Sequence, residues 1–195
     1  MMIGIHQGFR DLFSRVLRRP KIMEGDEILD GSRVWFISDM HFGSRNLLTW
    51  SRKPYFRNRH EMHTCLIRNW NQTVGRDDRI YCLGDFGDRR YMPQLNGDIR
   101  HAKGNHDTRN WNRQYVLRYC GKRFLVLHNP KDNTTWFDGD WIIHGHTHTN
   151  SPFIDIHHRR INVSAEVINF TPISMEEILR IIEESPGYRD DRMFL

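Results

Sequence analysis

Short segments of strand character alternate with stretches of helical periodicity along most of the chain, and this alternation predicts an α/β fold. The segments of strand character lie at 33–37, 79–83, 98–102, 123–127 and 140–144, with a further one near 161–167. The stretches that predict helices lie at 59–74, 109–119 and 174–184. Strands interleaved with helices are typical of packed sheets flanked by helices.

Two of these helices have clear sequence signatures. In the 59–74 stretch an apolar residue recurs at every fourth position, which places one stripe toward a core. The members of this stripe are Met62, Leu66, Trp70 and Val74. The 174–184 stretch opens with Ser174 and Glu177 in the spacing of a capping box, so a helix is expected to begin there.

The pattern divides the chain into three parts. Residues 1–32 predict an extension with an amphipathic helix over 9–17, which either packs on the domain surface or docks to a partner or a membrane surface. Residues 33–184 carry the α/β pattern and form the expected domain. Residues 185–195 contain Pro186 and Gly187 and predict a loose tail.

Composition excludes several classes of protein. At 195 residues, with 38% hydrophobic and 27% charged residues, the chain suits one globular domain rather than a disordered protein. No apolar run approaches the roughly 20 residues that a membrane span needs. Its three cysteines, Cys65, Cys82 and Cys120, form no C-x-x-C pair, which argues against a disulfide scaffold and predicts a reducing, cytoplasmic compartment. The net charge of +5 suits an anionic ligand such as a phosphate ester, a nucleotide or a nucleic acid.

Candidate chemistry appears where the predicted strands end. Five of them are each followed closely by Asp, Asn or His. These residues are Asp39, His41, Asp85, Asn105, His128, His146 and His148. Ligands of α/β sheets bind beyond the carboxyl ends of the strands, so these side chains are expected to converge on one site.

The donor set narrows the chemistry to a metal centre. Imidazoles and carboxylates without thiolates favour Mn, Fe, Zn or Ni. Seven ligands exceed the need of one ion but can hold two if one carboxylate bridges them. Two divalent ions bring four positive charges, of which Asp39, Asp85 and a hydroxide cancel three, so the site stays positive and suits a phosphate oxygen. Paired ions of this kind clamp the attacking and leaving oxygens of an in-line phosphoryl displacement.

Each motif alone has an ordinary structural interpretation. Gly104-Asn105-His106-Asp107 can be a simple turn, and the histidines of 144–148 can be a surface cluster that scavenges metal. The presence of all five motifs, each at the end of a predicted strand, favours the functional interpretation.

The complete set resembles the calcineurin-like metallophosphoesterase superfamily over about Arg33 to Glu184, and more narrowly a small single-domain branch found in bacteria and phages. The matching motifs are Asp39-x-His41, Gly84-Asp85-x-x-Asp88, Gly104-Asn105-His106-Asp107, His128 and Gly145-His146-x-His148. The resemblance implies a β-sandwich flanked by helices, with the metal site at the carboxyl ends of the strands. Ser44 departs from the branch, which often has His there.

The resemblance also implies roles for individual residues. One ion, with Mn expected, would be held by residues Asp39, His41, Asp85 and His148, and a second by Asp85, Asn105, His128 and His146. His106 would stabilise the transition state or protonate the leaving oxygen, with Asp107 orienting its ring. Arg89 would grip phosphate, because a guanidinium binds phosphate through two hydrogen bonds.

We therefore predict a dinuclear metal-dependent phosphoesterase that hydrolyses a mono- or diester by attack of a metal-bridged hydroxide. A nuclease of the same superfamily and a noncatalytic interaction scaffold are the alternatives. Basic and aromatic residues interleave at 50–59 and 109–122. These two segments either bind phosphates and stack bases or pack their aromatic side chains inward.

Overall fold

The computed structural model describes residues 26–29, 33–44, 46, 51–108, 111–112, 114–132 and 134–187. The helix expected over 9–17 and most of the expected tail, 188–195, lie outside these residues. The strands are β1 (Asp26–Ile28), β2 (Val34–Ile37), β3 (Arg79–Leu83), β4 (Asp98–Ala102), β5 (Gln114–Tyr119), β6 (Lys122–Leu127), β7 (Trp141–His144), β8 (Ile154–Asp155), β9 (Arg160–Asn162) and β10 (Ile173–Ser174). The helices are α3 (Arg59–Thr73), α4 (Met175–Glu184) and the short 3₁₀ helices η1 (Arg89–Gln94) and η2 (His148–Asn150).

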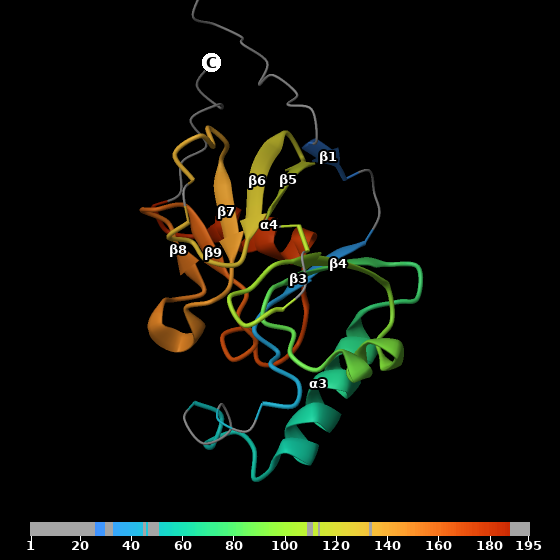
Figure 1. Ribbon diagram of the computed structural model, residues 1–195. Coiled ribbons are helices and arrows are strands. Elements are labelled where there is room, and N and C mark those ends of the chain that lie inside the picture. Colours follow the sequence, from blue (N-terminus) through green and yellow to red (C-terminus); the bar gives the residue numbers. More distant parts are fainter. Residues whose placement is uncertain are drawn as a thin grey trace, which may run out of the picture.

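The strands form two sheets (Figure 1). One has six strands in the order β1-β5-β6-β7-β9-β8, and the other has four in the order β10-β2-β3-β4. The β2–β3–β4 pairs and the β6–β7–β9 pairs are parallel. Each sheet therefore brings the carboxyl ends of consecutive strands to one edge, as the sequence predicts. This architecture confirms the expected α/β sandwich.

Two apolar layers form the core, and side chains that alternate along β3 contribute to both. Tyr81 and Leu83 join one cluster together with residues of β5, β6, β7 and α4. Ile80 and Cys82 point the other way, into a second cluster with α3. Successive side chains of a strand face opposite sides, so one buried strand serves both layers. The second layer contains the stripe predicted from the sequence, since Met62, Leu66, Trp70 and Val74 are all buried.

The predicted helices over 59–74 and 174–184 are confirmed as α3 and α4. Asn58 caps α3, because its side chain accepts a hydrogen bond from the Glu61 amide over 2.9 Å. Ser174 caps α4 in the same way, by accepting from the Glu177 amide over 3.0 Å.

The helix predicted over 109–119 is wrong, because 114–119 forms strand β5. β5 pairs antiparallel with β6, with Tyr119 opposite Lys122. Cys120 and Gly121 join the two strands with φ angles of 46° and 76°. Two consecutive positive φ angles are typical of the tight turn that joins hairpin strands. The aromatic and β-branched residues of 114–119 favour a strand, although the spacing of the apolar residues in 109–119 resembles that of a helix.

β1 lies ahead of Arg33, where the domain was expected to begin, and yet it belongs to the six-stranded sheet. It pairs in parallel with β5 at the sheet edge. Glu27 on β1 bonds with Arg79 and Tyr81 on β3. Residues 26–29 are therefore joined to both sheets.

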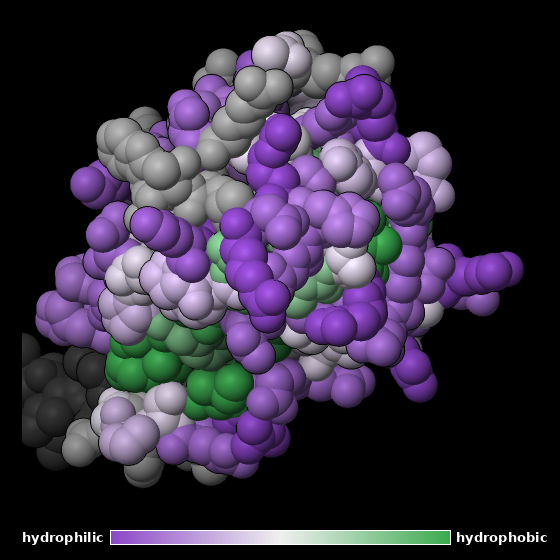
Figure 2. Space-filling model, turned by 90° about the horizontal axis from the view of Figure 1, so that it is seen from below, coloured by the Kyte–Doolittle hydropathy of each residue, from purple (hydrophilic) through white to green (hydrophobic). Residues whose placement is uncertain are grey.

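The surface is mostly hydrophilic on the face seen from below, with an apolar patch at the lower left of the view (Figure 2). An apolar groove of about 380 Å³ is lined in part by Trp35, Phe153, Ile168 and Ile173. Among the helices within the described ranges, none combines the length and apolarity that a membrane crossing requires.

Candidate metal centre

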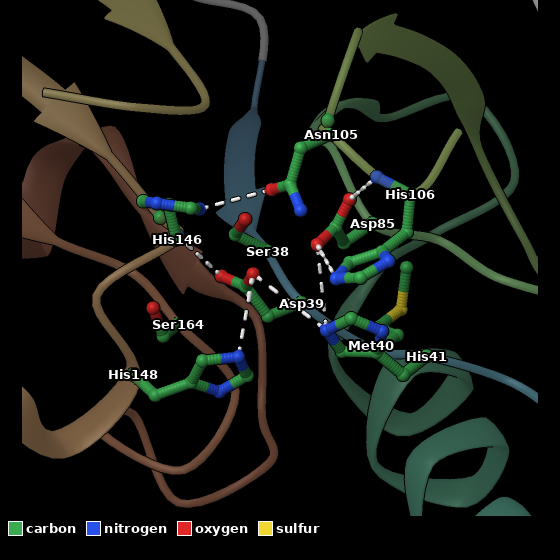
Figure 3. A network of polar contacts seen from close by, with 12 residues as sticks. Ser38, Asp39, Met40, His41, Asp85, Asn105, His106, His146, His148 and Ser164 are labelled. Atoms are coloured by element: carbon green, nitrogen blue, oxygen red, sulfur yellow. Dashed lines mark hydrogen bonds and ion pairs between the residues drawn. The ribbon is translucent and has the colours of Figure 1, made fainter. Parts of the chain in front are cut away.

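The predicted ligands are carried on the ends of five strands that meet in one place (Figure 3). Three strands of the four-stranded sheet supply Asp39 and His41 after β2, Asp85 after β3 and Asn105 after β4. The six-stranded sheet supplies His128 after β6, and His146 and His148 after β7. The convergence expected from the strand ends is thus present in the structure.

Within this site, two groups of side chains can hold a metal ion. One consists of Asp39, His41 and His148, and the other of Asp39, Asp85 and His128. In each group the donor atoms lie within 4.8 Å of one another. Asp39 belongs to both groups. Asp85 Oδ2 lies 3.6 Å from both His41 Nε2 and His128 Nε2, so this carboxylate lies between a histidine of each group.

Asn105, His128 and His146 bring three further donor atoms together. His128 donates from Nδ1 to the Leu83 carbonyl oxygen over 2.7 Å, which leaves its Nε2 with a lone pair. That Nε2 lies 2.9 Å from Asn105 Oδ1 and 3.2 Å from His146 Nδ1. Electron-pair donors gathered in this way suit a bound cation.

Two buried atoms without hydrogen-bond partners in the described part of the chain indicate that the site fits a metal ion. Asp39 Oδ1 and His41 Nε2 are buried and make no hydrogen bond within the described residues. A buried polar group without a partner costs about 1–3 kcal/mol, and coordination of a cation would remove this cost. Burial lowers the pKa of His41 to about 4, and burial together with the neighbouring His128 also lowers the pKa of His146. Both rings are therefore neutral at pH 7, which is the form that binds metal.

The backbone at the site is in an uncommon conformation. Positive φ angles occur at Asp39 (59°), His41 (49°), Asp85 (52°), His146 (68°) and His148 (45°). Asp and His tolerate this left-handed region better than most residues do. Even so, positive φ angles are uncommon outside glycine, and here five candidate ligands of one site have them. Strained residues cluster at functional sites, where the surrounding structure holds them in place.

Close approach of the strand ends also depends on glycine. A Cβ atom added to Gly145 would lie 1.9 Å from Ser38 Oγ and 2.5 Å from Asp39 Oδ2. The turn after β7 can therefore come up against Asp39 only because position 145 has no side chain.

His106 and Asp107 lie at the same site with different environments. The His106 side chain is 68% exposed, and its Nε2 lies 3.9 Å from Asp85 Oδ2. Asp107 Oδ2 accepts hydrogen bonds from the backbone amides of Gly104 and Asp85, each over 2.9 Å. Asp107 thereby ties the end of β4 to the end of β3, a role that the sequence did not predict.

Arg89 lies at the start of η1. Its guanidinium carbon is 6.0 Å from the centre of the Trp111 ring, and that ring stacks on His101 with 4.2 Å between the centroids. Binding of phosphate by Arg89 stays a prediction.

The sequence reasoning missed two residues that lie behind the ligands. The buried Glu166 contacts His148, and the buried Arg52 pairs with Glu166. Burial alone would raise the pKa of Glu166, but its hydrogen bond to His148 and the charge of Arg52 lower the pKa to about 2. Burial alone would lower the pKa of His148, but the bond to Glu166 and the charge of Asp39 raise it. β9 ends at Asn162, ahead of Glu166. The sequence placed Glu166 inside the strand expected near 161–167, so the strand-end rule did not single it out.

Comparison with known proteins places the chain among several relatives. No protein-family model matches it. It is 40% identical over 171 residues to the uncharacterized protein MJ1445 of Methanocaldococcus jannaschii, covering 80% of this chain and 95% of the relative. It is 26% identical over 184 residues to the gene 66 protein of Mycobacterium phage L5, covering 69% of this chain and 87% of that protein.

Solved structures share the fold. The structure of AQ665 from Aquifex aeolicus, a protein of unknown function, superposes with a TM-score of 0.61 at 23% identity, covering 77% of this chain and 99% of the other. A predicted phosphoesterase from Streptococcus pneumoniae superposes less closely, with a TM-score of 0.43 at 16% identity, covering 68% of this chain and 71% of the other.

Proposed function

The chain belongs to the family of MJ1445, and we propose that it is a metal-dependent phosphoesterase of the calcineurin-like metallophosphoesterase superfamily. The observation that carries this proposal is the meeting of carboxylate, amide and imidazole donors from five strand ends. The buried and unpartnered Asp39 Oδ1 and His41 Nε2 support it further, since both atoms lack a hydrogen-bond partner within the described ranges.

The chain offers ligands for two divalent ions, and manganese is the metal proposed. One ion would be held by Asp39, His41, Asp85 and His148, and the other by Asp85, Asn105, His128 and His146. Asp85 is proposed as the shared ligand, because its Oδ2 stands 3.6 Å from a histidine of each set. Such ions, when bound, supply a water-derived nucleophile at neutral pH and neutralise charge on the phosphoryl group.

The protein's own side chains would complete the reaction. His106 projects an exposed ring beside Asp85, so it can donate a proton to the leaving oxygen or stabilise negative charge on it. Asp107 is proposed to orient the His106 ring, and its hydrogen bond from the Gly104 amide fixes the turn that carries both residues. Arg89 would bind a phosphate oxygen of the substrate.

The substrate is proposed to be a phosphate mono- or diester, which includes nucleotides and nucleic acids. The net charge of +5 favours an anionic substrate. Of the basic residues in 50–59, Arg52 is fully buried, so it is not available to bind a substrate phosphate. A panel with a nitrophenyl monoester, a nitrophenyl diester, cyclic nucleotides and single-stranded nucleic acid, each with added Mn²⁺, distinguishes an esterase from a nuclease.

The Asp85→Asn variant tests the proposed site directly. The amide oxygen can still accept the hydrogen bond that Asp85 Oδ1 receives from the His106 amide over 2.9 Å, so the metal-free fold should survive. Loss of the shared charge should lower metal content and abolish turnover. Asp155→Asn, which removes a carboxylate that contacts His158, is the matched control and should keep both. Full activity of the folded Asp85→Asn protein, or of wild-type protein after exhaustive chelation, would contradict the proposal.

A further inference from the structure

A buried ion pair lies directly behind the candidate metal ligands. Arg52 Nε donates to Glu166 Oε1 over 2.7 Å, and neither side chain has any exposed surface. Burying two charges is unfavourable unless the remaining hydrogen-bonding atoms of both groups also find partners. Those further partners belong to the metal centre.

Glu166 contacts the ring of His148. His148 Nδ1 lies 3.2 Å from each of the Glu166 carboxylate oxygens. Because an ionised carboxylate only accepts hydrogen bonds, Nδ1 carries a proton, and in the neutral ring that binds metal Nε2 then has the lone pair. Nε2 is the ring atom on the side of Asp39, 3.8 Å from its Oδ1. Glu166 thus selects both the tautomer of His148 and the direction of its free nitrogen.

Arg52 holds the turn that carries the other two ligands of this group. Its Nη1 donates to the Met40 carbonyl oxygen over 2.7 Å, and its Nη2 donates to the carbonyl oxygen of Asp39. This turn has positive φ angles at Asp39 and His41. One guanidinium therefore joins the strained turn after β2 to the carboxylate that orients His148.

The main chain of His148 is anchored separately. Asn162 Nδ2 donates to the His148 carbonyl oxygen over 2.8 Å. Removal of the Glu166 charge should therefore leave the backbone of His148 in place and release only the ring.

From these contacts we infer that Arg52 and Glu166 are a positioning pair for the ion held by Asp39, His41 and His148. The inference rests on the proposed function, since it needs a metal at this site. Neither residue is a ligand. They act through the orientation of His148 and of the Asp39–His41 turn.

Calorimetric titration of the metal-stripped full chain with Mn²⁺ tests the pair without relying on turnover. Glu166→Gln keeps the shape of the side chain but turns an NH₂ group toward either Arg52 Nε or His148 Nδ1, both of which are donors. Residues that orient a ligand typically contribute about 10–100-fold to metal affinity, so a loss of this size is expected. Glu27→Gln is the matched control, because Glu27 also pairs with an arginine, Arg79, and should keep wild-type affinity.

A double-mutant comparison separates positioning from a general structural role. If Glu166 acts through the His148 ring, then adding Glu166→Gln to His148→Ala should cause no further loss of Mn²⁺ affinity. Full additivity of the two losses would overturn the inference. If Glu166→Gln fails to fold, Arg52→Lys provides the test. Lysine keeps the charge but cannot reach Glu166 and the carbonyl oxygens of Asp39 and Met40 together. The Arg52→Lys protein should therefore also bind Mn²⁺ more weakly than wild type.

Two further outcomes are distinguishable. Equal Mn²⁺ affinity of wild type and the folded Glu166→Gln protein, or of wild type and Arg52→Lys, would overturn the positioning pair and leave the proposed function intact. Absence of Mn²⁺ binding by wild type itself would overturn both.

Discussion

Gly104→Ala should damage the site by pushing two strand ends apart. A Cβ atom at Gly104 would lie 2.2 Å from Asp85 Oδ1 and 2.3 Å from the Asp85 backbone nitrogen. Real Cβ contacts are essentially never shorter than 3.0 Å, so the ends of β3 and β4 must separate by at least about 0.7 Å to clear the Asp85 backbone nitrogen. Asn105 and His106 would move away from Asp85 with the end of β4.

This displacement has two measurable consequences. Overpacking of this kind typically costs about 1–3 kcal/mol, which at this chain length lowers the Tm by roughly 2–4 °C for each kcal/mol. A misplacement of about 1 Å in a catalytic group can cost on the order of 100-fold in turnover. Urea denaturation of the metal-free protein measures the first effect, and Mn²⁺-dependent hydrolysis of a nitrophenyl ester measures the second.

Gly75→Ala is the matched control, because the atoms nearest to its Cβ would be those of the Asp78 side chain, with Oδ2 at 3.2 Å. Its free energy of unfolding should stay within about 0.5 kcal/mol of wild type, with normal turnover. Wild-type turnover of the Gly104→Ala protein would refute the reasoning, since it would mean that the approach of β4 to Asp85 does not set the geometry of the site.

Two further predictions concern His106 and Tyr81. His106→Ala should leave metal content near normal and lower turnover by about 10²–10⁴-fold. The loss should be smaller for esters of a good leaving group such as nitrophenolate, because that group needs no proton. Equal losses for good and poor leaving groups would argue against the acid role. Tyr81→Phe removes the hydrogen bond from the phenol to Glu27 and should cost about 1.5–3 kcal/mol at pH 7, as expected for a bond to a charged group. Burial and the bond to Glu27 raise the pKa of Tyr81, so the stability that this phenol contributes is present below its unfolded pKa of about 10 and is lost as the pH rises toward its folded pKa. Urea denaturation from pH 8 to 11 should therefore show a steeper fall for wild type than for Tyr81→Phe, and parallel curves would contradict this assignment.

The sequence allowed most of the parallel strands and their end residues to be predicted, because each strand is a local apolar run followed by a polar motif. β2, β3 and β4 have the expected bounds to within one residue. The segment 114–119 was assigned to the wrong element, because its identity depends on pairing with β6, which local spacing does not reveal.

The residues behind the ligands were harder to predict for a different reason. Arg52 and Glu166 are 114 positions apart in the chain and meet only in the folded protein. In sequence, Arg52 belongs to a basic and aromatic stretch that is compatible both with phosphate binding and with inward packing of the aromatic side chains. Its burial follows from partners on two other segments, the Asp39–Met40 turn and Glu166, and no pattern within 50–59 encodes them.

The left-handed backbone conformation of the five candidate ligands lowers the stability of the fold. A left-handed residue other than glycine costs roughly 1 kcal/mol, so the five ligands together cost on the order of 5 kcal/mol, which is comparable to the whole net stability of a small domain. Replacement of any of them by glycine would relieve this cost and destroy a ligand at the same time. The joint presence of five left-handed residues is therefore a cost in fold stability that is concentrated at the proposed metal site.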